Sequence, residues 1–309
     1  MRKVGSKAVV GIAAISAAAF GVVGCSADGG AAASGGEERS RGSVSVKAGT
    51  GSSLDQLTGA GRSAVGLTAD GRLVGFLVNK PGAAVPLGTV KGLTGDTRLV
   101  AIDFRVQDGK LYGVGDQGGI YTVRTVGAKA TKVGQLTAAL QGQSFGVDFN
   151  PAANRLRVIS DTGQNLRHNI DDPNGAPAAG TTAVDGTLTN PAPATGPALG
   201  VTAAAYTNND LDATTATTLF DIDTTNDQVS VQSPANAGNL APTGKLGVDA
   251  GAATGFDIHY APRSGVNTAY AVINSKLYTV NLLTGKATSS GTVGGGRQVV
   301  DLALPIGQG

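Results

Sequence analysis

The sequence predicts an all-β protein, a five-bladed β-propeller of four-stranded blades in which the C-terminal strand completes the first blade. Three observations support this fold class. Short apolar strands alternate with Asp-Gly and Thr-Gly turns, a set of local marks returns at intervals of about fifty residues, and the copies at the two ends of the chain complement each other. The 309 residues, 41% of them hydrophobic, are enough to bury a large core.

Composition favours strands over helices. The chain has 48 Gly and 12 Pro, only 4% aromatic residues and no Trp. From Ala64 onward no helical period of apolar residues persists for three turns. Many short strands joined by tight turns are the structure that this pattern predicts.

The N-terminal residues 1–24 have the features of a bacterial lipoprotein signal peptide. Arg2, Lys3 and Lys7 form a positive segment, and an uncharged run of small and apolar residues follows. The run ends in Val-Val-Gly before Cys25, which is similar to the lipobox that precedes an acylated cysteine. Because Cys25 is the only cysteine in the chain, we expect it to carry a lipid rather than a disulfide.

The rest of the chain divides at a change of composition. Residues 25–62 are rich in Gly, Ala and Ser, which predicts a flexible stalk. Residues 63–305 are expected to form a single propeller domain. The expected location is therefore extracytoplasmic, with the protein held on a bacterial membrane by its N-terminal lipid anchor.

The clearest repeated mark is a glycine, any residue, and then Val or Leu. It occurs five times, beginning at Gly88, Gly134, Gly186, Gly244 and Gly291. A period near fifty residues is typical of propeller blades or of a solenoid.

A second mark, expected to begin each blade at its innermost strand, decides between closed and open repeats. It reads Ala-Ile-Asp-Phe at 101–104, and related copies lie at 146–149, 203–206 and 255–258. The fifth copy, at 299–302, lies at the C-terminal end, whereas the first unit has no such strand before it. A closed ring requires this displacement, and a β-sandwich or an open solenoid does not predict it.

The third unit carries a family resemblance. Its sequence is Gly-Val-Asp-Phe-Asn-Pro at 146–151, Arg-Leu-Arg-Val at 155–158 and Thr-Gly-Gln-Asn-Leu-Arg at 162–167. Together with residues 201–208 and 218–223, it resembles the bacterial domain-of-unknown-function family 4394. The similarity covers nearly all of the predicted propeller. It implies an exported protein with this fold, and it implies no known chemistry.

Four of the five predicted innermost strands carry an aspartate at the same position, Asp103, Asp148, Asp257 and Asp301, and Ala205 takes this place in the fifth. One hypothesis is a ring of carboxylates that coordinates a hard cation such as Ca²⁺. The other is that each carboxylate accepts hydrogen bonds from backbone N–H groups of the neighbouring blade. No other cofactor is expected.

A few further side chains are candidates for chemistry. His259 follows Asp257 and is placed to point toward the centre, although a packed or solvated histidine is the ordinary interpretation. Arg157 and Arg167 are candidates for contact with an anion, and the ordinary alternative is a solvated strand face.

Charge and motifs narrow the function. The formal net charge is +2. Without the three basic residues of the predicted signal, the basic residues are slightly outnumbered by the 22 acidic ones. This balance excludes a nucleic-acid partner, which requires a basic surface to neutralise phosphates. The sequence favours a membrane-anchored, non-enzymatic binding or interaction module. Its ligand would be a protein, an envelope component or a small molecule. The alternative is a metal-dependent hydrolase that uses the aspartates and His259 at the mouth of the central channel.

Overall fold

The structure is a computed structural model of the chain that describes residues 54, 57, 61–212 and 214–308. The chain divides into two units, Met1–Ala48 and Gly49–Gly309, and all described residues belong to the second. The predicted signal peptide, Cys25 and most of the predicted stalk lie outside the described residues. No helix within the described part has the length and hydropathy needed to span a bilayer.

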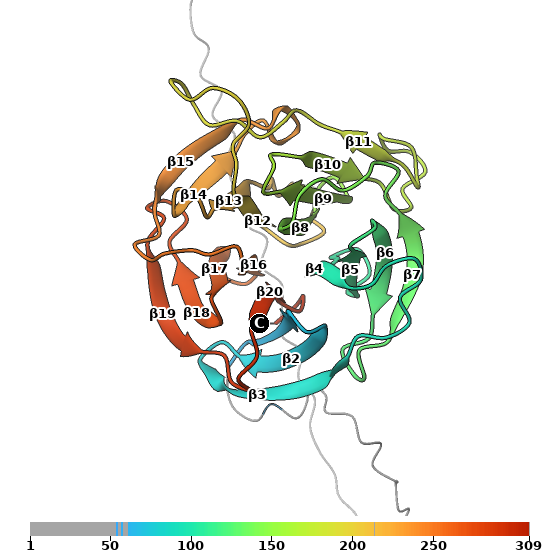
Figure 1. Cartoon of the computed structure of the whole chain (residues 1–309), viewed down its shortest axis with the longest axis vertical. Helices are drawn as coiled ribbons and strands as arrows, with labels where there is room; N and C mark the ends of the chain where they lie inside the picture. The colour runs from blue at the N-terminus through green and yellow to red at the C-terminus, as the bar shows by residue number, and fades with distance from the viewer. Residues whose placement is uncertain (1–53, 55–56, 58–60, 213, 309) are drawn as a thin grey trace, which may run out of the picture. The chain divides into compact units, whose positions relative to one another are not determined.

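The described strands form five antiparallel sheets of four strands each, arranged around a central axis (Figure 1), which confirms the predicted five-bladed β-propeller. From the axis outward, blade 1 consists of β20 (Val299–Ala303), β1 (Ser63–Thr68), β2 (Arg72–Leu77) and β3 (Lys80–Thr89). Blade 2 consists of β4 (Leu99–Phe104), β5 (Leu111–Gly115), β6 (Gly119–Val123) and β7 (Ala130–Gln135). Blade 3 consists of β8 (Phe145–Asn150), β9 (Arg155–Ser160), β10 (Asn165–His168) and β11 (Thr182–Val184).

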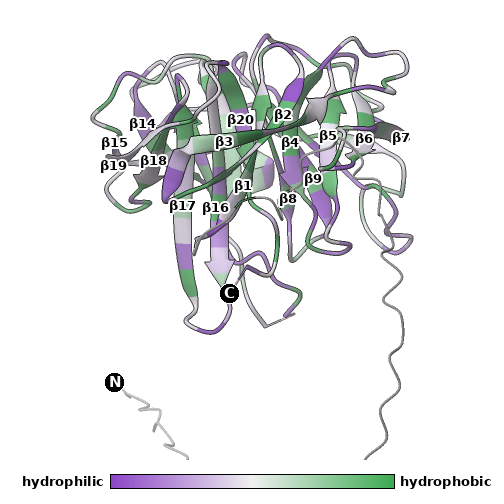
Figure 2. Cartoon of the chain, turned by 90° about the horizontal axis from the view of Figure 1, so that it is seen from below, coloured by the Kyte–Doolittle hydropathy of each residue, from purple (hydrophilic) through white to green (hydrophobic). Residues whose placement is uncertain are grey.

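The remaining two blades follow the same order. Blade 4 consists of β12 (Val201–Tyr206), β13 (Leu219–Asp223), β14 (Gln228–Gln232) and β15 (Leu240–Lys245), with the short 3-10 helix η2 (Ala235–Ala237) between its last two strands. Blade 5 consists of β16 (Thr254–Ala261), β17 (Val266–Ile273), β18 (Lys276–Val280) and β19 (Ala287–Thr292). In the side view, β16 and β17 extend beyond the other strands, next to the C-terminus (Figure 2).

Ring closure occurs as the sequence predicts. Strand β20 pairs antiparallel with β1, so that Leu302 lies opposite Gly66 and Asp301 opposite Leu67. The last strand of the chain is therefore the innermost strand of the first blade. Pairing the two ends of the chain leaves no open seam in the ring.

The repeated Gly-x-Val/Leu mark lies at or just after the end of each outermost strand. In every copy the Val or Leu donates its backbone N–H to a carbonyl group in the turn between the second and third strands of its own blade, for example Leu188 to Gly163 and Leu246 to Asp227. In four of the five copies the glycine faces the neighbouring blade, and Gly134 instead faces Ile120 of its own blade. A Cβ on Gly186 would collide with the carbonyl oxygen of Ala237, so only glycine fits there.

Burial decreases from the axis outward. The innermost strands are buried along nearly their whole length, whereas outermost strands such as β7 and β15 are largely exposed. Neighbouring innermost strands approach each other closely, because a Cβ on Gly146 would lie 2.7 Å from the Cα of Ala203. A Cβ on Gly255 would likewise collide with the backbone at Asp301. The small residues that begin the repeated innermost strands are therefore required by the crowding at the axis.

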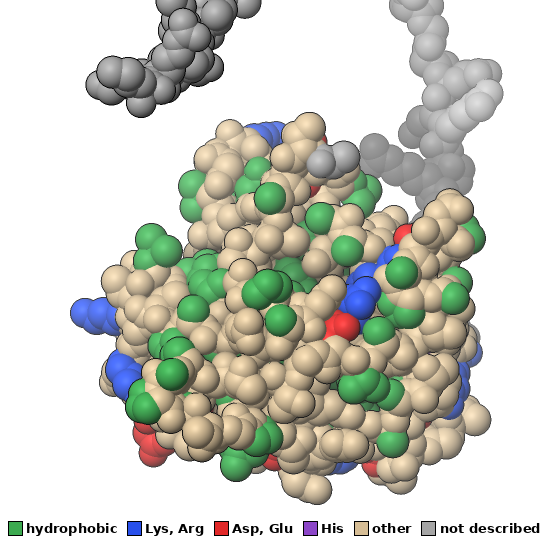
Figure 3. Space-filling view, turned by 90° about the horizontal axis from the view of Figure 1, so that it is seen from above, with side chains coloured by type: hydrophobic (Ala, Val, Ile, Leu, Met, Phe, Trp, Pro, Cys, Tyr) green, Lys and Arg blue, Asp and Glu red, His purple; other side chains and the backbone are tan. Residues whose placement is uncertain are grey.

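Five clusters of buried apolar side chains, one at each interface between neighbouring blades, form the described core. Leu302, Phe76 and Val272 belong to the cluster that joins blades 1 and 5. Leu54, from the predicted stalk, packs beside Gly75 at the interface of blades 1 and 2. On the flank shown in Figure 3, apolar side chains are scattered among polar ones.

Candidate functional site

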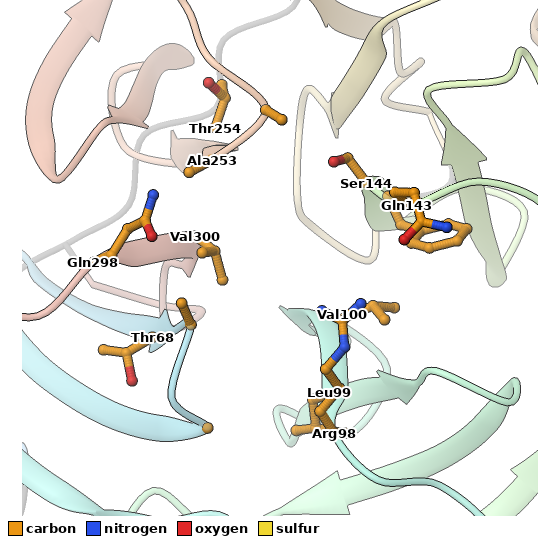
Figure 4. A pocket seen from close by; sticks show the side chains of 14 residues that line it. Thr68, Arg98, Leu99, Val100, Gln143, Ser144, Ala253, Thr254, Gln298 and Val300 are labelled. Carbon is orange, nitrogen blue, oxygen red and sulfur yellow. The ribbon is translucent and has the colours of Figure 1, made fainter.

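A pocket with a cavity volume of about 280 Å³ lies at the end of the axis where the innermost strands begin (Figure 4). Four blades contribute to this pocket. Its lining includes the first residues of β4, β8, β16 and β20 and the residues that directly precede these strands. Blade 1 adds Thr68, Ala69 and Gly71, at the end of β1 and just after it. Concave sites shared between structural units are common ligand-binding positions.

Three long polar side chains surround this mouth pocket, and each comes from a different blade. Arg98 directly precedes β4, Gln143 lies two residues before β8, and Gln298 directly precedes β20. None of these three side chains forms a hydrogen bond or an ion pair with another described residue, although their backbone groups are bonded. Arg98 is also the one charged side chain among the lining residues.

The pocket also has an apolar part, formed by Leu99, Val100, Phe145 and Val300. Among its shorter polar side chains, the hydroxyl groups of Thr68 and Thr254 already form hydrogen bonds within the protein. A ligand at this mouth would therefore meet an apolar surface and free donors from Arg98 and the two glutamines.

Deeper along the same innermost strands lie the aspartates that the sequence singles out. Asp103, Asp148 and Asp257 each place one carboxylate oxygen within 4.8 Å of the others, and all three side chains are buried. Asp301 is buried as well. In blade 4, Ala205 leaves this level without a carboxylate. The structure thus brings the four predicted aspartates together. Three of them form one cluster, and Asp301 lies near enough to raise the pKa of Asp103.

These carboxylates connect the blades. Asp301 accepts a hydrogen bond of 2.7 Å from the backbone N–H of Ile102 in blade 2, and Asp103 accepts one of 2.9 Å from Phe149 in blade 3. Asp257 accepts one of 2.6 Å from Leu304, which follows β20. The predicted structural role, in which these aspartates accept hydrogen bonds from backbone N–H groups of a neighbouring blade, is therefore present.

Burial also changes the acidity of the cluster. Removal from water raises the pKa of Asp103, Asp148 and Asp301 well above its ordinary value, and the neighbouring carboxylates raise it further. Burial raises the pKa of Asp257 to about 7. Backbone hydrogen bonds act in the opposite direction and do not offset the burial.

His259 is separate from this cluster. Its Nε2 lies 2.7 Å from the backbone oxygen of Gln308, and its Nδ1 is buried without a partner among the described residues. Burial, together with the nearby Arg62, lowers the pKa of its imidazole. His259 therefore packs against the C-terminal segment, as the ordinary interpretation of the sequence has it.

The two candidate anion-binding arginines both engage a carboxylate of the chain itself. Arg157 is only 2% exposed and donates to Asp185, at 2.7 Å, and to Asn165 and Asn236. Arg167 donates to both oxygens of the same Asp185. The expected solvated strand face does not describe Arg157, because its guanidinium lies between blades 3 and 4.

Sequence reasoning missed two features. The mouth side chains Arg98, Gln143 and Gln298 do not repeat, so the search for repeated marks passed over them, although all three lie within two residues of a repeated innermost strand. Asp221 on β13 is fully buried, and neither of its carboxylate oxygens has a hydrogen-bond partner among the described residues. In the sequence Asp221 lies inside the apolar run of residues 219–222, but nothing there shows that its carboxylate is buried without a partner.

Comparison with known proteins adds a family. The family model described as Domain of unknown function (DUF4394) matches residues 72–303. No curated protein matches the chain. Similar solved structures include a nidogen/laminin complex, with 9% identity over 80% of this chain and 99% of that chain and a TM-score of 0.46. An auxiliary nutrient binding protein from Bacteroides thetaiotaomicron has 11% identity over 79% of this chain and 64% of that chain, with a TM-score of 0.43. Likenesses at this level support no inference about ligands.

Proposed function

The chain belongs to the DUF4394 family, whose function is unknown, and from this premise we propose that it is a binding module whose ligand occupies the mouth pocket of the propeller. The observation that supports this proposal is the set of free polar side chains around the pocket. Arg98, Gln143 and Gln298 come from three blades, line one cavity and form no side-chain bond with the described residues. Convergent polar groups on a partly apolar concave surface are typical of small-molecule sites.

The size and charge of the pocket define the class of ligand. A volume of about 280 Å³ lies at the lower end of the range for ligand pockets, so the ligand is small. The lining contains Arg98 and no acidic side chain. A guanidinium pairs best with a planar anion, and the two glutamine amides add donors and acceptors. We therefore expect a small polar molecule that carries a carboxylate or a phosphate group.

Thermal unfolding of the full-length protein tests this proposal. The probes are acetate, succinate, citrate and inorganic phosphate at equal ionic strength, and the variants are Arg98→Gln and, as a matched control, Arg263→Gln. Arg263 is exposed and follows β16 at the opposite end of the innermost strands. We expect at least one probe to raise the unfolding midpoint of the wild type and of Arg263→Gln. The affinity of that probe for Arg98→Gln should be lower by about tenfold or more, because the variant loses one charged hydrogen bond to the probe.

Two results would contradict the proposal. One is that no probe changes the midpoint of the wild type. The other is that a probe stabilises Arg98→Gln as much as Arg263→Gln, which would place its binding site elsewhere. Nonspecific electrostatic binding would weaken equally in both variants, so the matched pair separates it from binding in the pocket.

The cellular address is part of the same proposal. We propose that the propeller is extracytoplasmic and tethered to a bacterial membrane through a lipid on Cys25, which the positive, apolar and lipobox-like segments of residues 1–25 support. Labelling of producing cells with palmitate should mark the wild type and leave Cys25→Ser unlabelled. Equal labelling of both proteins would contradict this assignment.

A further inference from the structure

The buried aspartates at the axis are a second candidate site, distinct from the mouth pocket. Asp103 comes from β4, Asp148 from β8 and Asp257 from β16, and one oxygen of each lies within 4.8 Å of the other two. The three side chains are at most 4% exposed. Three blades thus direct carboxylates toward one small volume.

The negative charge of this cluster has no basic partner. None of the salt bridges between described residues involves these aspartates. The groups that donate to them are backbone N–H groups, those of Phe104, Phe149, Tyr206, Ile258 and Leu304. Partial charges on N–H groups do not neutralise several carboxylates in an interior of low polarity. In its ionised form the cluster therefore needs another source of positive charge, and without one its carboxylates take up protons.

Asp148 provides an independent indication of a missing partner. Its side chain is 1% exposed, and its Oδ1 is buried with no hydrogen-bond partner among the described residues. Both oxygens of Asp103 and of Asp257, by contrast, accept backbone hydrogen bonds. A buried carboxylate oxygen without a partner is costly, so a ligand at this place would stabilise the fold.

We propose that the axis of the propeller binds one Ca²⁺ ion through the carboxylates of Asp103, Asp148 and Asp257, with Asp301 as the neighbouring fourth negative charge. The donors are all oxygens of carboxylates, which hard cations prefer, and the cluster contains no His or Cys. The ion would hold three blades together at the axis. This binding does not depend on a ligand in the mouth pocket.

The irregular arrangement of the donors favours Ca²⁺ over Mg²⁺. One oxygen of each aspartate lies within 4.8 Å of the other two, which brings all three within reach of one cation. Mg²⁺ demands near-ideal octahedral geometry, whereas Ca²⁺ tolerates irregular coordination and so suits a ring in which one of five blades lacks the carboxylate.

Calorimetric titration of the chelator-treated full-length protein with CaCl₂ at about pH 7.5, where ordinary carboxylates are ionised, tests the proposal. The wild type should bind about one equivalent of Ca²⁺, with a dissociation constant of about 10⁻⁶ to 10⁻³ M. At about a hundredfold excess over this constant, the unfolding midpoint should rise by about 5–10 °C. MgCl₂ should bind more weakly and raise the midpoint less.

Two isosteric variants locate the ion. Asp148→Asn keeps the shape of the side chain and removes its charge, and Asp221→Asn is the matched control, because Asp221 is also buried and lies outside the cluster. Asp148→Asn should weaken Ca²⁺ binding by about tenfold or more, the loss of one charged ligand, and Asp221→Asn should bind as the wild type does. The unfolding midpoint without metal shows that each variant is folded.

Three outcomes would overturn the proposal. The first is a wild type that shows neither heat of binding nor a change of midpoint up to about 10 mM CaCl₂, roughly ten times the weakest constant expected. The second is equal Ca²⁺ affinity of Asp148→Asn and the wild type, which would place the ion elsewhere. The third is tighter binding of Mg²⁺ than of Ca²⁺.

Discussion

Closure of the ring by β20 can be tested with a single truncation, Leu302→Ala. Leu302 is 1% exposed and packs with Phe76 of blade 1 and Val272 of blade 5. Replacing a fully buried leucine by alanine removes the transfer energy of its methyl groups and leaves a cavity, at a cost of about 2–5 kcal/mol. With about 3 kcal/mol lost, the unfolding midpoint of a domain of this size should fall by about 6–12 °C.

The control for this prediction is Leu283→Ala. Leu283 is 80% exposed, so the same change of side chain should alter the free energy of unfolding by less than about 0.5 kcal/mol. Urea denaturation of both variants, followed by circular dichroism, measures the difference. If Leu302→Ala were no less stable than Leu283→Ala, β20 would not pack between blades 1 and 5, and the closed ring would be refuted.

Three further predictions follow from the same contacts. Gly255→Ala should lower the free energy of unfolding by about 3 kcal/mol, because its Cβ would meet the backbone at Asp301 near the axis. A Cβ on Gly82 would meet one backbone oxygen at an ordinary contact distance of 3.8 Å, so Gly82→Ala should change the free energy of unfolding by less than about 0.5 kcal/mol in urea denaturation; equal effects would contradict the crowding. Arg157→Met should lower the free energy of unfolding by about 3–5 kcal/mol, because it leaves a buried ion pair incomplete. The side chain of Arg167 is 22% exposed, so Arg167→Met should lower the free energy of unfolding clearly less in the same assay; the reverse order would count against the role of Arg157. In chelator, the free energy of unfolding of the wild type, taken relative to that of Asp257→Asn, should fall as the pH rises from about 4 to 7. The folded state holds the proton of Asp257, with a pKa of about 7, more tightly than the unfolded chain, a difference on the order of 4 kcal/mol. The buried His168 and His259, whose lowered pKa acts in the opposite direction, are present in both proteins and cancel in the comparison, so a difference that rises over this interval would refute the assignment.

Much of the fold could be predicted because each repeated mark reports a local requirement. Gly186 and Gly255 stand where a Cβ would strike a neighbouring blade. Glycine recurs in all five copies at the position of Gly186, and Gly or Ala stands in four of the five copies at the position of Gly255. The copy of the innermost strand near Asp301 was recognisable because it repeats the pattern around Asp103. The pairing of β20 with β1 then follows from the need to cover a sheet edge.

The candidate site could be predicted only in part. The aspartates at the axis repeat, and the sequence placed them at one level, but it could not show that Asp148 Oδ1 lacks a partner. Arg98 and Gln298 surround one pocket although about two thirds of the chain separates them, and no repeat marks either. For Arg157, the sequence suggested contact with an anion, and the structure supplies that anion as Asp185.

The sequence by itself determined the class of fold, the number of blades and the closure of the ring, because turn residues, strand periodicity and crowded glycines are properties of short segments repeated along the chain. Only the tertiary structure decided which side chains meet. The distances between Asp103, Asp148 and Asp257, and the free groups of the mouth pocket, depend on how the blades are placed around the axis. The local charge, the burial of a side chain and the presence of a hydrogen-bond partner all depend on segments that are far apart in sequence. These properties are therefore defined only when the ring closes.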